Sequence, residues 1–192
     1  MRYFRKKTAF FLIILVSFLG ILWADDLRKV PMDMYLIVDG STSFQSAKSD
    51  AIAWVNGQVV DRILMEGDRI TIWSAGDRAQ IVYSAEVSST GVKTEVKDRL
   101  LALSTDGRTS DFSGALRELE PRLLQTAQNR ISYTMLITAS AGGLESVLTG
   151  SSSDMLKWFR SEKFQRWQAF VLAPDIGSKA SQAAIDYMNS QR

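Results

Sequence analysis

Apolar and polar positions along the chain predict strands that alternate with helices. Three short runs are almost wholly apolar and have the length of strands, as buried parallel strands do: "MYLIVD" (34–39), "SYTMLITAS" (132–140) and "WQAFVLAP" (167–174). The segments 68–76 and 79–87 alternate apolar and polar side chains on either side of a turn, which predicts two further strands.

Apolar residues at helical spacing predict the elements between these strands. Helices are expected over 46–64, 90–104, 111–128, 154–164 and 178–192. Asp111 or Ser110 is the expected N-cap of the third of them. The alternation predicts the α/β fold class: a doubly wound, mainly parallel sheet with helices on both faces.

The N-terminal segment is typical of an export signal. A basic stretch, "MRYFRKK", precedes 17 mostly apolar residues from Thr8 to Ala24, which predict an N-terminal hydrophobic helix. This length exceeds a usual signal-peptide core and is just short of a comfortable membrane span, so a cleaved signal peptide and a retained transmembrane anchor both stay open. A cleavage after Ala24 would place Leu22 at position −3, where cleavage sites have a small residue, and this favours the retained anchor.

The expected organisation is therefore a signal peptide or anchor at 1–24, a linker at 25–31 and one domain at 32–192. Either form of the N-terminal segment places the domain outside the cytoplasm: in a periplasm, on a cell surface or secreted. A retained anchor would attach it to the membrane.

Composition narrows the chemistry that this domain can carry. The 192 residues include no cysteine and no histidine, which excludes thiolate nucleophiles, Ser-His-Asp triads and metals held by either residue. A bound metal would be held by oxygen, as Mg²⁺, Ca²⁺ and Mn²⁺ are. Four of the 23 cations stand in the first seven residues, and the other 19 face 21 acids, so no nucleic-acid partner is expected.

Oxygen-bearing side chains follow the first apolar strand. Asp39 ends that strand, and Ser41 and Ser43 come two and four residues later, in the turn into a helix. Ligands of parallel α/β sheets bind at the carboxyl ends of the strands, and a hard divalent cation takes about six oxygens. The spacing is therefore consistent with a cation site whose neutral hydroxyls leave excess positive charge for an outside carboxylate. N-capping of the next helix is the alternative role for the same side chains.

The pattern "DxSxS" at Asp39, Ser41 and Ser43 resembles the start of the metal-ion-dependent adhesion site of von Willebrand factor type A (vWA) domains. Residues 67–87 are similar to the second and third strands of that family, and residues 97–119 to its second metal-binding loop and next helix. The resemblance implies a vWA fold and a protein-interaction module. It further implies a bound Mg²⁺, with Mn²⁺ or Ca²⁺ as alternatives, whose coordination is completed by an acidic side chain of a protein partner.

The resemblance also implies one more hydroxyl ligand, from the second loop. Counting back from the "GAL" of the next helix gives Ser110, whereas the local "GRT" context gives Thr109, so both stay candidates, with Asp111 as the helix cap. The third loop departs from the family pattern, because Ala139 in "LITASAGG" stands where the family usually has an aspartate. The missing carboxylate predicts a partly degenerate site with weaker cation binding.

Two alternatives to this function remain. A metal-free scaffold of a cell-envelope complex would need only the fold. A phosphoryl-transfer enzyme related to the haloacid dehalogenases would also use a strand-end Asp, but Ser41 stands where that family has its second Asp. The sequence contains no glycine-rich phosphate loop either. We therefore expect a non-enzymatic interaction module.

Overall fold

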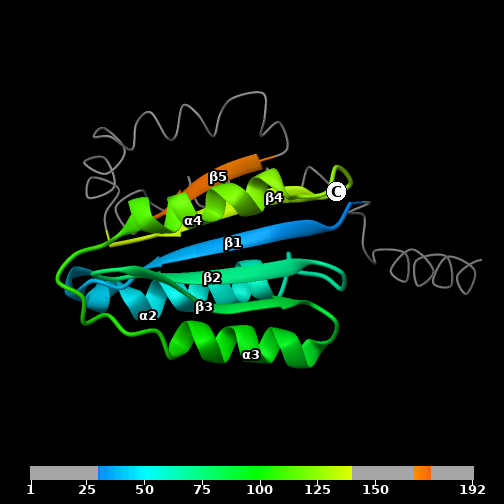
Figure 1. Cartoon of the computed structure of the whole chain (residues 1–192). Coiled ribbons are helices and arrows are strands. Elements are labelled where there is room, and N and C mark those ends of the chain that lie inside the picture. The colour runs from blue at the N-terminus through cyan, green and yellow to red at the C-terminus, as the bar shows by residue number, and fades with distance from the viewer. Residues whose placement is uncertain (1–29, 140–166, 174–192) are drawn as a thin grey trace, which may run out of the picture. The chain divides into compact units, whose positions relative to one another are not determined.

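A five-stranded sheet in the order β3-β2-β1-β4-β5 forms the centre of the computed structural model (Figure 1). The structure describes residues 30–139 and 167–173. The neighbouring strands pair in parallel, except that β3 runs antiparallel to β2 at one edge. The strands are β1 (Met32–Asp39), β2 (Arg69–Ala75), β3 (Ala79–Glu86), β4 (Ile131–Ile137) and β5 (Trp167–Leu172).

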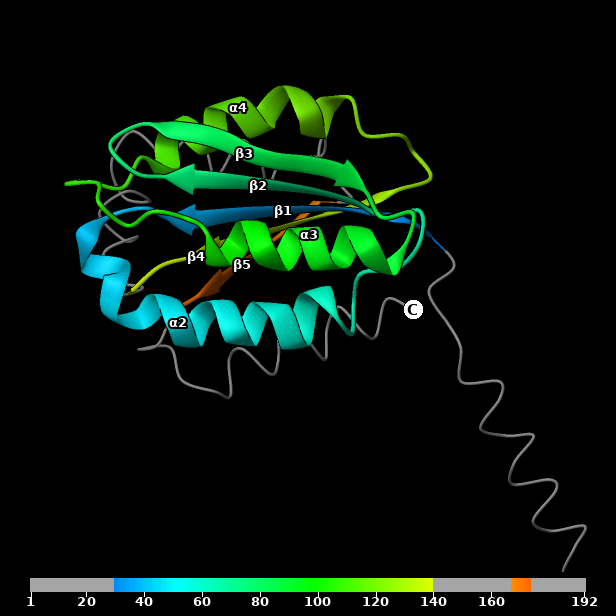
Figure 2. The same ribbon diagram turned by 90° about the horizontal axis from the view of Figure 1, so that it is seen from below.

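Helices cover both faces of the sheet. Helices α2 (Gln45–Trp54) and α3 (Thr90–Leu101) lie on one face, and α4 (Phe112–Leu124) lies on the other (Figure 2). This arrangement confirms the predicted α/β class with a mainly parallel sheet. The helices expected at 154–164 and 178–192, and the hydrophobic segment at 1–24, lie outside the described residues. Within the described residues, no helix is long and apolar enough to cross a membrane.

Strand β1 is buried at all eight of its positions because both of its faces carry a core. Leu36 packs with Ile72 in the core beneath α2 and α3. Ile37, on the opposite face, packs with Trp73 in the core beneath α4. Double burial explains why this strand is an uninterrupted apolar run in the sequence.

The predicted helix over 46–64 is divided in the structure. A short 3₁₀ turn, η1 (Thr42–Phe44), precedes α2, and a π-helical segment, η2 (Val55–Val60), follows it. Val59 and Val60 are adjacent, and both are fully buried.

A buried ion pair closes the amino end of the sheet. Arg130 Nε donates to Asp33 Oδ1 at 2.7 Å, and Arg130 Nη2 donates to the Met32 carbonyl at 2.8 Å. The two side chains are only 9% and 6% exposed. These contacts tie the start of β1 to the segment that leads into β4.

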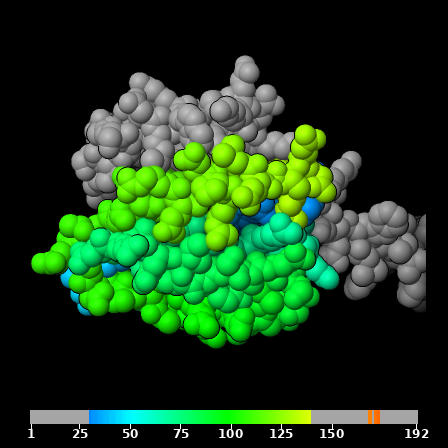
Figure 3. Space-filling view, viewed as in Figure 1, coloured from blue at the N-terminus to red at the C-terminus, as the bar shows by residue number. Residues whose placement is uncertain are grey.

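A polar hollow of about 360 Å³ lies at the same end, where blue atoms of β1 show between α4 and β2 in Figure 3. Its lining includes Asp33, Tyr35 and Arg122. Burial, together with the nearby charge of Asp33, raises the pKa of Tyr35 above its usual 10.0. The guanidinium of Arg122 lies 5.6 Å from the ring centroid of Trp73. This hollow is at the end of β1 opposite to Asp39.

Candidate cation site

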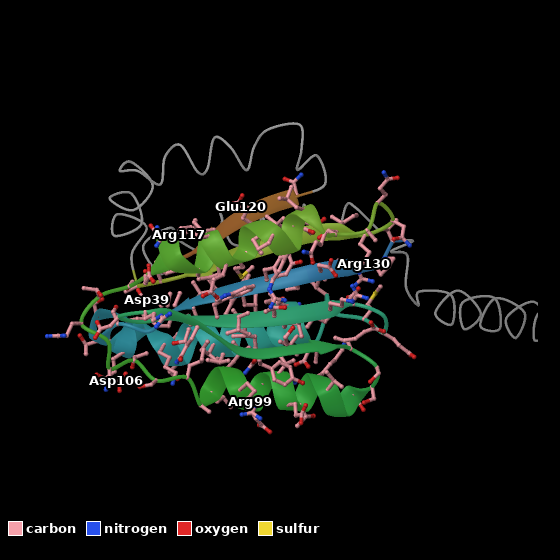
Figure 4. The ribbon with its side chains drawn as sticks, in the orientation of Figure 1. Asp39, Arg99, Asp106, Arg117, Glu120 and Arg130 are labelled. Atoms are coloured by element: carbon pink, nitrogen blue, oxygen red, sulfur yellow. The ribbon has the colours of Figure 1, made fainter. Side chains whose placement is uncertain are left out.

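Three chain segments contact the carboxylate of Asp39. Asp39 is the last residue of β1, is 3% exposed, and lies at the carboxyl end of the sheet (Figure 4). Its Oδ1 accepts hydrogen bonds from the Ser41 amide at 2.8 Å and from Ser110 Oγ at 2.6 Å. Its Oδ2 accepts one from Thr138 Oγ1 at 2.9 Å. Residues far apart in the sequence thus converge on one buried anion.

Strand register explains why Thr138 reaches this carboxylate. Val38 of β1 pairs with Ile137 of β4, so the next residues, Asp39 and Thr138, lie at the same level along the two strands. Asp39 also pairs with Ala75, the last residue of β2. The carboxyl ends of three parallel strands are therefore aligned, as the sequence pattern predicted for a ligand site.

Ser41 and Ser43 lie beside each other in the turn after β1. Their hydroxyl oxygens are 2.8 Å apart, and Ser41 is buried while Ser43 is exposed. Ser41 stands at the N-cap position of η1, but no side chain caps either η1 or α2. The N-capping alternative for these serines is therefore wrong in this turn, where their hydroxyls contact each other.

Close backbone packing brings the second loop to the site. The Gly107 amide donates to the Gly40 carbonyl at 3.0 Å, and the Thr42 amide donates to the Gly107 carbonyl at 2.8 Å. A Cβ atom on Gly40 would lie 2.9 Å from the Gly76 Cα atom, and one on Gly107 would lie 3.0 Å from the Gly40 carbonyl. Real Cβ atoms do not show the first distance, and the second is tighter than most Cβ contacts, so glycine at 40 and 107 permits the approach that carries Ser110 to Asp39.

The two hydroxyl candidates of the second loop have different partners. Ser110 contacts Asp39, whereas Thr109 Oγ1 donates to Asp77 Oδ1 at 3.2 Å. The Asp111 side chain accepts from the Gly114 amide at 2.8 Å, which confirms Asp111, and not Ser110, as the cap of α4. The structure therefore brings Ser110 to the site and directs Thr109 away from it.

Asp77, in the turn between β2 and β3, was not singled out by sequence reasoning. Backbone N–H donation from Thr109 and then from Arg108 lowers the pKa of the Asp77 carboxyl below its usual 3.8. Thr138 was missed as well. The signal that could have found it is the level register of the first and fourth strands, which places any hydroxyl after the fourth strand beside Asp39.

Ala139 follows Thr138 and is half-buried against the core beneath α2 and α3. No carboxylate therefore enters the site from the described part of this third loop. Across the described ranges, no group of three or more His, Cys, Asp or Glu side chains could hold a metal ion. The donor set is thus one carboxylate with neighbouring hydroxyls, and these hard oxygen donors fit Mg²⁺, Mn²⁺ or Ca²⁺ rather than a softer metal.

The fold is that of vWA domains. A von Willebrand factor type A protein from Catenulispora acidiphila is 16% identical, with a TM-score of 0.50 over 74% of this chain and 33% of that one. The manganese-loaded TRAP protein of Plasmodium vivax is 17% identical, with a TM-score of 0.53 over 86% of this chain and 65% of that one. This chain thus spans about a third of the first protein and less than two thirds of the second.

No protein-family model matches the sequence, and no curated protein matches it. The structural likeness confirms the vWA resemblance that "DxSxS" and the following segments indicated. At these identities, the likeness establishes the fold.

Proposed function

We propose that this protein is an exported, non-enzymatic interaction module. In this proposal, a divalent cation held at Asp39, Ser41, Ser43 and Ser110 binds an acidic side chain of a protein partner. The observation that carries the proposal is the 2.6 Å hydrogen bond from Ser110 to Asp39. It places a hydroxyl of the second loop at the "DxSxS" turn.

The charge of the donor set supports an acidic partner. One carboxylate and neutral hydroxyls would leave a doubly charged cation with a net positive charge, which attracts an anion from outside. Ser43 is exposed, so the ligand shell is open on the side of solvent. Mg²⁺ is the expected ion, and the manganese-loaded TRAP protein shows a fold of this class in a manganese-bound form. Ala139 makes weak affinity the expectation.

The export part of the proposal rests on the N-terminal sequence. The basic start and the apolar stretch up to Ala24 have the order of a signal peptide or anchor. Protease added to intact cells should degrade the domain if it is surface-exposed. A periplasmic domain should become digestible once the outer envelope is opened, and digestion only after the cytoplasmic membrane is broken would contradict export.

Calorimetric titration of Mg²⁺ and Mn²⁺ into the full chain tests the cation site. We expect binding heat from the wild-type protein and its loss in Ser41→Ala. The matched control is Ser46→Ala, which removes an exposed hydroxyl from α2, one turn beyond the site. Heat that is absent from the wild type, or that is unchanged in Ser41→Ala, would contradict the proposal.

A metal-free scaffold is the second candidate, and one observation favours it. Both Asp39 oxygens already accept hydrogen bonds from within the chain: Ser41 and Ser110 on Oδ1 and Thr138 on Oδ2. A buried carboxylate that is satisfied in this way does not require a cation. Absent binding heat, together with a loss of stability in Ser110→Ala, would support the scaffold.

A further inference from the structure

The β2–β3 turn holds the loop that carries Ser110. Asp77 Oδ1 accepts hydrogen bonds from the Arg108 amide at 2.7 Å, the Thr109 amide at 3.0 Å and the Thr109 hydroxyl at 3.2 Å. One carboxylate oxygen therefore binds both residues that directly precede Ser110.

The residue that follows Ser110 is held by the same turn. The Asp111 amide donates to the Gly76 carbonyl at 2.9 Å, and the Ala79 amide donates to Asp111 Oδ2 at 3.1 Å. Ser110 is thus flanked on both sides by attachments to the residues around Asp77, while its own hydroxyl reaches Asp39.

These attachments matter because of where Ser110 lies, in the loop between α3 and α4. Helix α3 ends at Leu101 and α4 begins at Phe112, so Ser110 lies on a connection outside both helices, which pairs with the turn after β1 three residues earlier, at Gly107. A site residue keeps a productive position only when its supporting contacts are fixed. Asp77 supplies such contacts from a hairpin turn that the sheet itself positions.

We propose that Asp77 is a positioning residue of the cation site: by accepting hydrogen bonds from Arg108 and Thr109, it fixes Ser110 against Asp39. The inference rests on the proposed cation-binding function and adds a residue from a fourth chain segment to it. Asp77 touches no cation in this arrangement and acts through Ser110.

Calorimetric titration of Mg²⁺ and Mn²⁺ into full-chain variants tests the inference. Asp77→Ala removes the acceptor, and we expect affinity to fall about 10- to 100-fold, as for other outer-shell partners of metal ligands. Asp77→Asn keeps an acceptor oxygen without the charge. We expect its affinity for the cation to stay within about threefold of wild type, since Asp77 acts by fixing the position of Ser110 and not by its charge.

Asp106→Ala is the matched control for charge. Asp106 lies at the same end of the sheet as Asp39 (Figure 4) and lines the same hollow of about 280 Å³ as Asp77. Its carboxylate makes no hydrogen bond or ion pair within the part of the chain that the structure describes. Removal of this carboxylate should leave affinity unchanged.

Hydrogen exchange separates this inference from the cation-binding proposal. With or without cation, Asp77→Ala should speed amide exchange at residues 108–111 by at least about tenfold and leave β4 unchanged, because only the loop is released. Asp77→Ser, which also removes the carboxylate, serves if Asp77→Ala fails to fold.

Three results would overturn the inference: wild-type affinity in a folded Asp77→Ala, equal losses in Asp77→Ala and Asp77→Asn, or unchanged exchange at 108–111. Wild-type protein that binds no cation would contradict the proposed function, and the exchange data would then decide whether Asp77 positions the loop.

Discussion

Ser110 donates a 2.6 Å hydrogen bond to Asp39, across 71 residues of sequence. Its neighbour Thr109 carries a similar hydroxyl, but that hydroxyl contacts Asp77. The hydroxyls of these adjacent residues therefore have different partners, and single substitutions can test each contact by itself.

The first prediction compares these two hydroxyls. Ser110→Ala should weaken Mg²⁺ binding by at least about tenfold, because a proposed ligand and a hydrogen-bond donor to Asp39 are both lost. Thr109→Ala should change it by less than about threefold, since the two backbone amides still bind Asp77. Calorimetry of both variants measures this, and a larger loss in Thr109→Ala would assign the ligand to Thr109 instead.

The second prediction concerns the alanine in the third loop. The vWA pattern has an aspartate at the position of Ala139, so Ala139→Asp is expected to raise Mg²⁺ affinity at least about tenfold. The cation-free protein should lose about 1–3 kcal/mol of unfolding free energy, because a carboxylate replaces a half-buried methyl group that packs against the core. Denaturant unfolding with and without Mg²⁺ measures both effects, and Ala139→Asn is the uncharged control. Equal behaviour of the two variants would show that charge at residue 139 does not reach the site.

The third prediction tests the close backbone packing at Gly40. Gly40→Ala should lower the unfolding free energy by about 1–3 kcal/mol or more, because its Cβ atom would lie 2.9 Å from the backbone of Gly76. Gly57→Ala is the matched control: a Cβ atom there would have nothing within 4 Å, so the change should be neutral or stabilise η2 by up to about 1 kcal/mol. Thermal unfolding compares them. A harmless Gly40→Ala would show that the loops can separate without cost.

The fourth prediction contrasts two ion pairs. Arg130→Met should cost about 3–5 kcal/mol, since it leaves the Asp33 carboxylate buried without its cation. Arg69→Met should cost about 0–1 kcal/mol, because Arg69 and Glu86 are 58% and 57% exposed and screened by water. Urea unfolding gives both values. Similar costs would mean that water reaches the Arg130 pair.

The fifth prediction follows from the lowered pKa of Asp77. A carboxyl whose pKa is lower in the folded state adds stability above its unfolded pKa of about 3.8 and loses it as pH falls through the folded pKa. The wild type should therefore lose stability more steeply than Asp77→Asn below about pH 4. Unfolding temperatures at about pH 2.5 to 6 measure this, and parallel curves for the two proteins would contradict it.

Local sequence was sufficient for the strands, for the helices within the described residues and for the polar turn after β1. Buried strands need apolar residues on both faces, so β1, β4 and β5 are readable as apolar runs. Asp39, Ser41 and Ser43 lie within five residues, and their proximity follows from chain connectivity alone. The Asp111 cap is also local, because its partner is the Gly114 amide three residues away.

Tertiary structure alone decided which distant groups contact Asp39. The choice between Ser110 and Thr109 depends on the attachment of their loop to the β2–β3 turn, and the role of Thr138 depends on the register of β4 against β1. Hydrophobic periodicity determines which face of an element is buried, but the direction of a loop hydroxyl is set by contacts with segments far away in the sequence. Sequence therefore determined the sheet and the oxygen-bearing residues that follow its first strand, and three-dimensional packing determined which distant residues contact them.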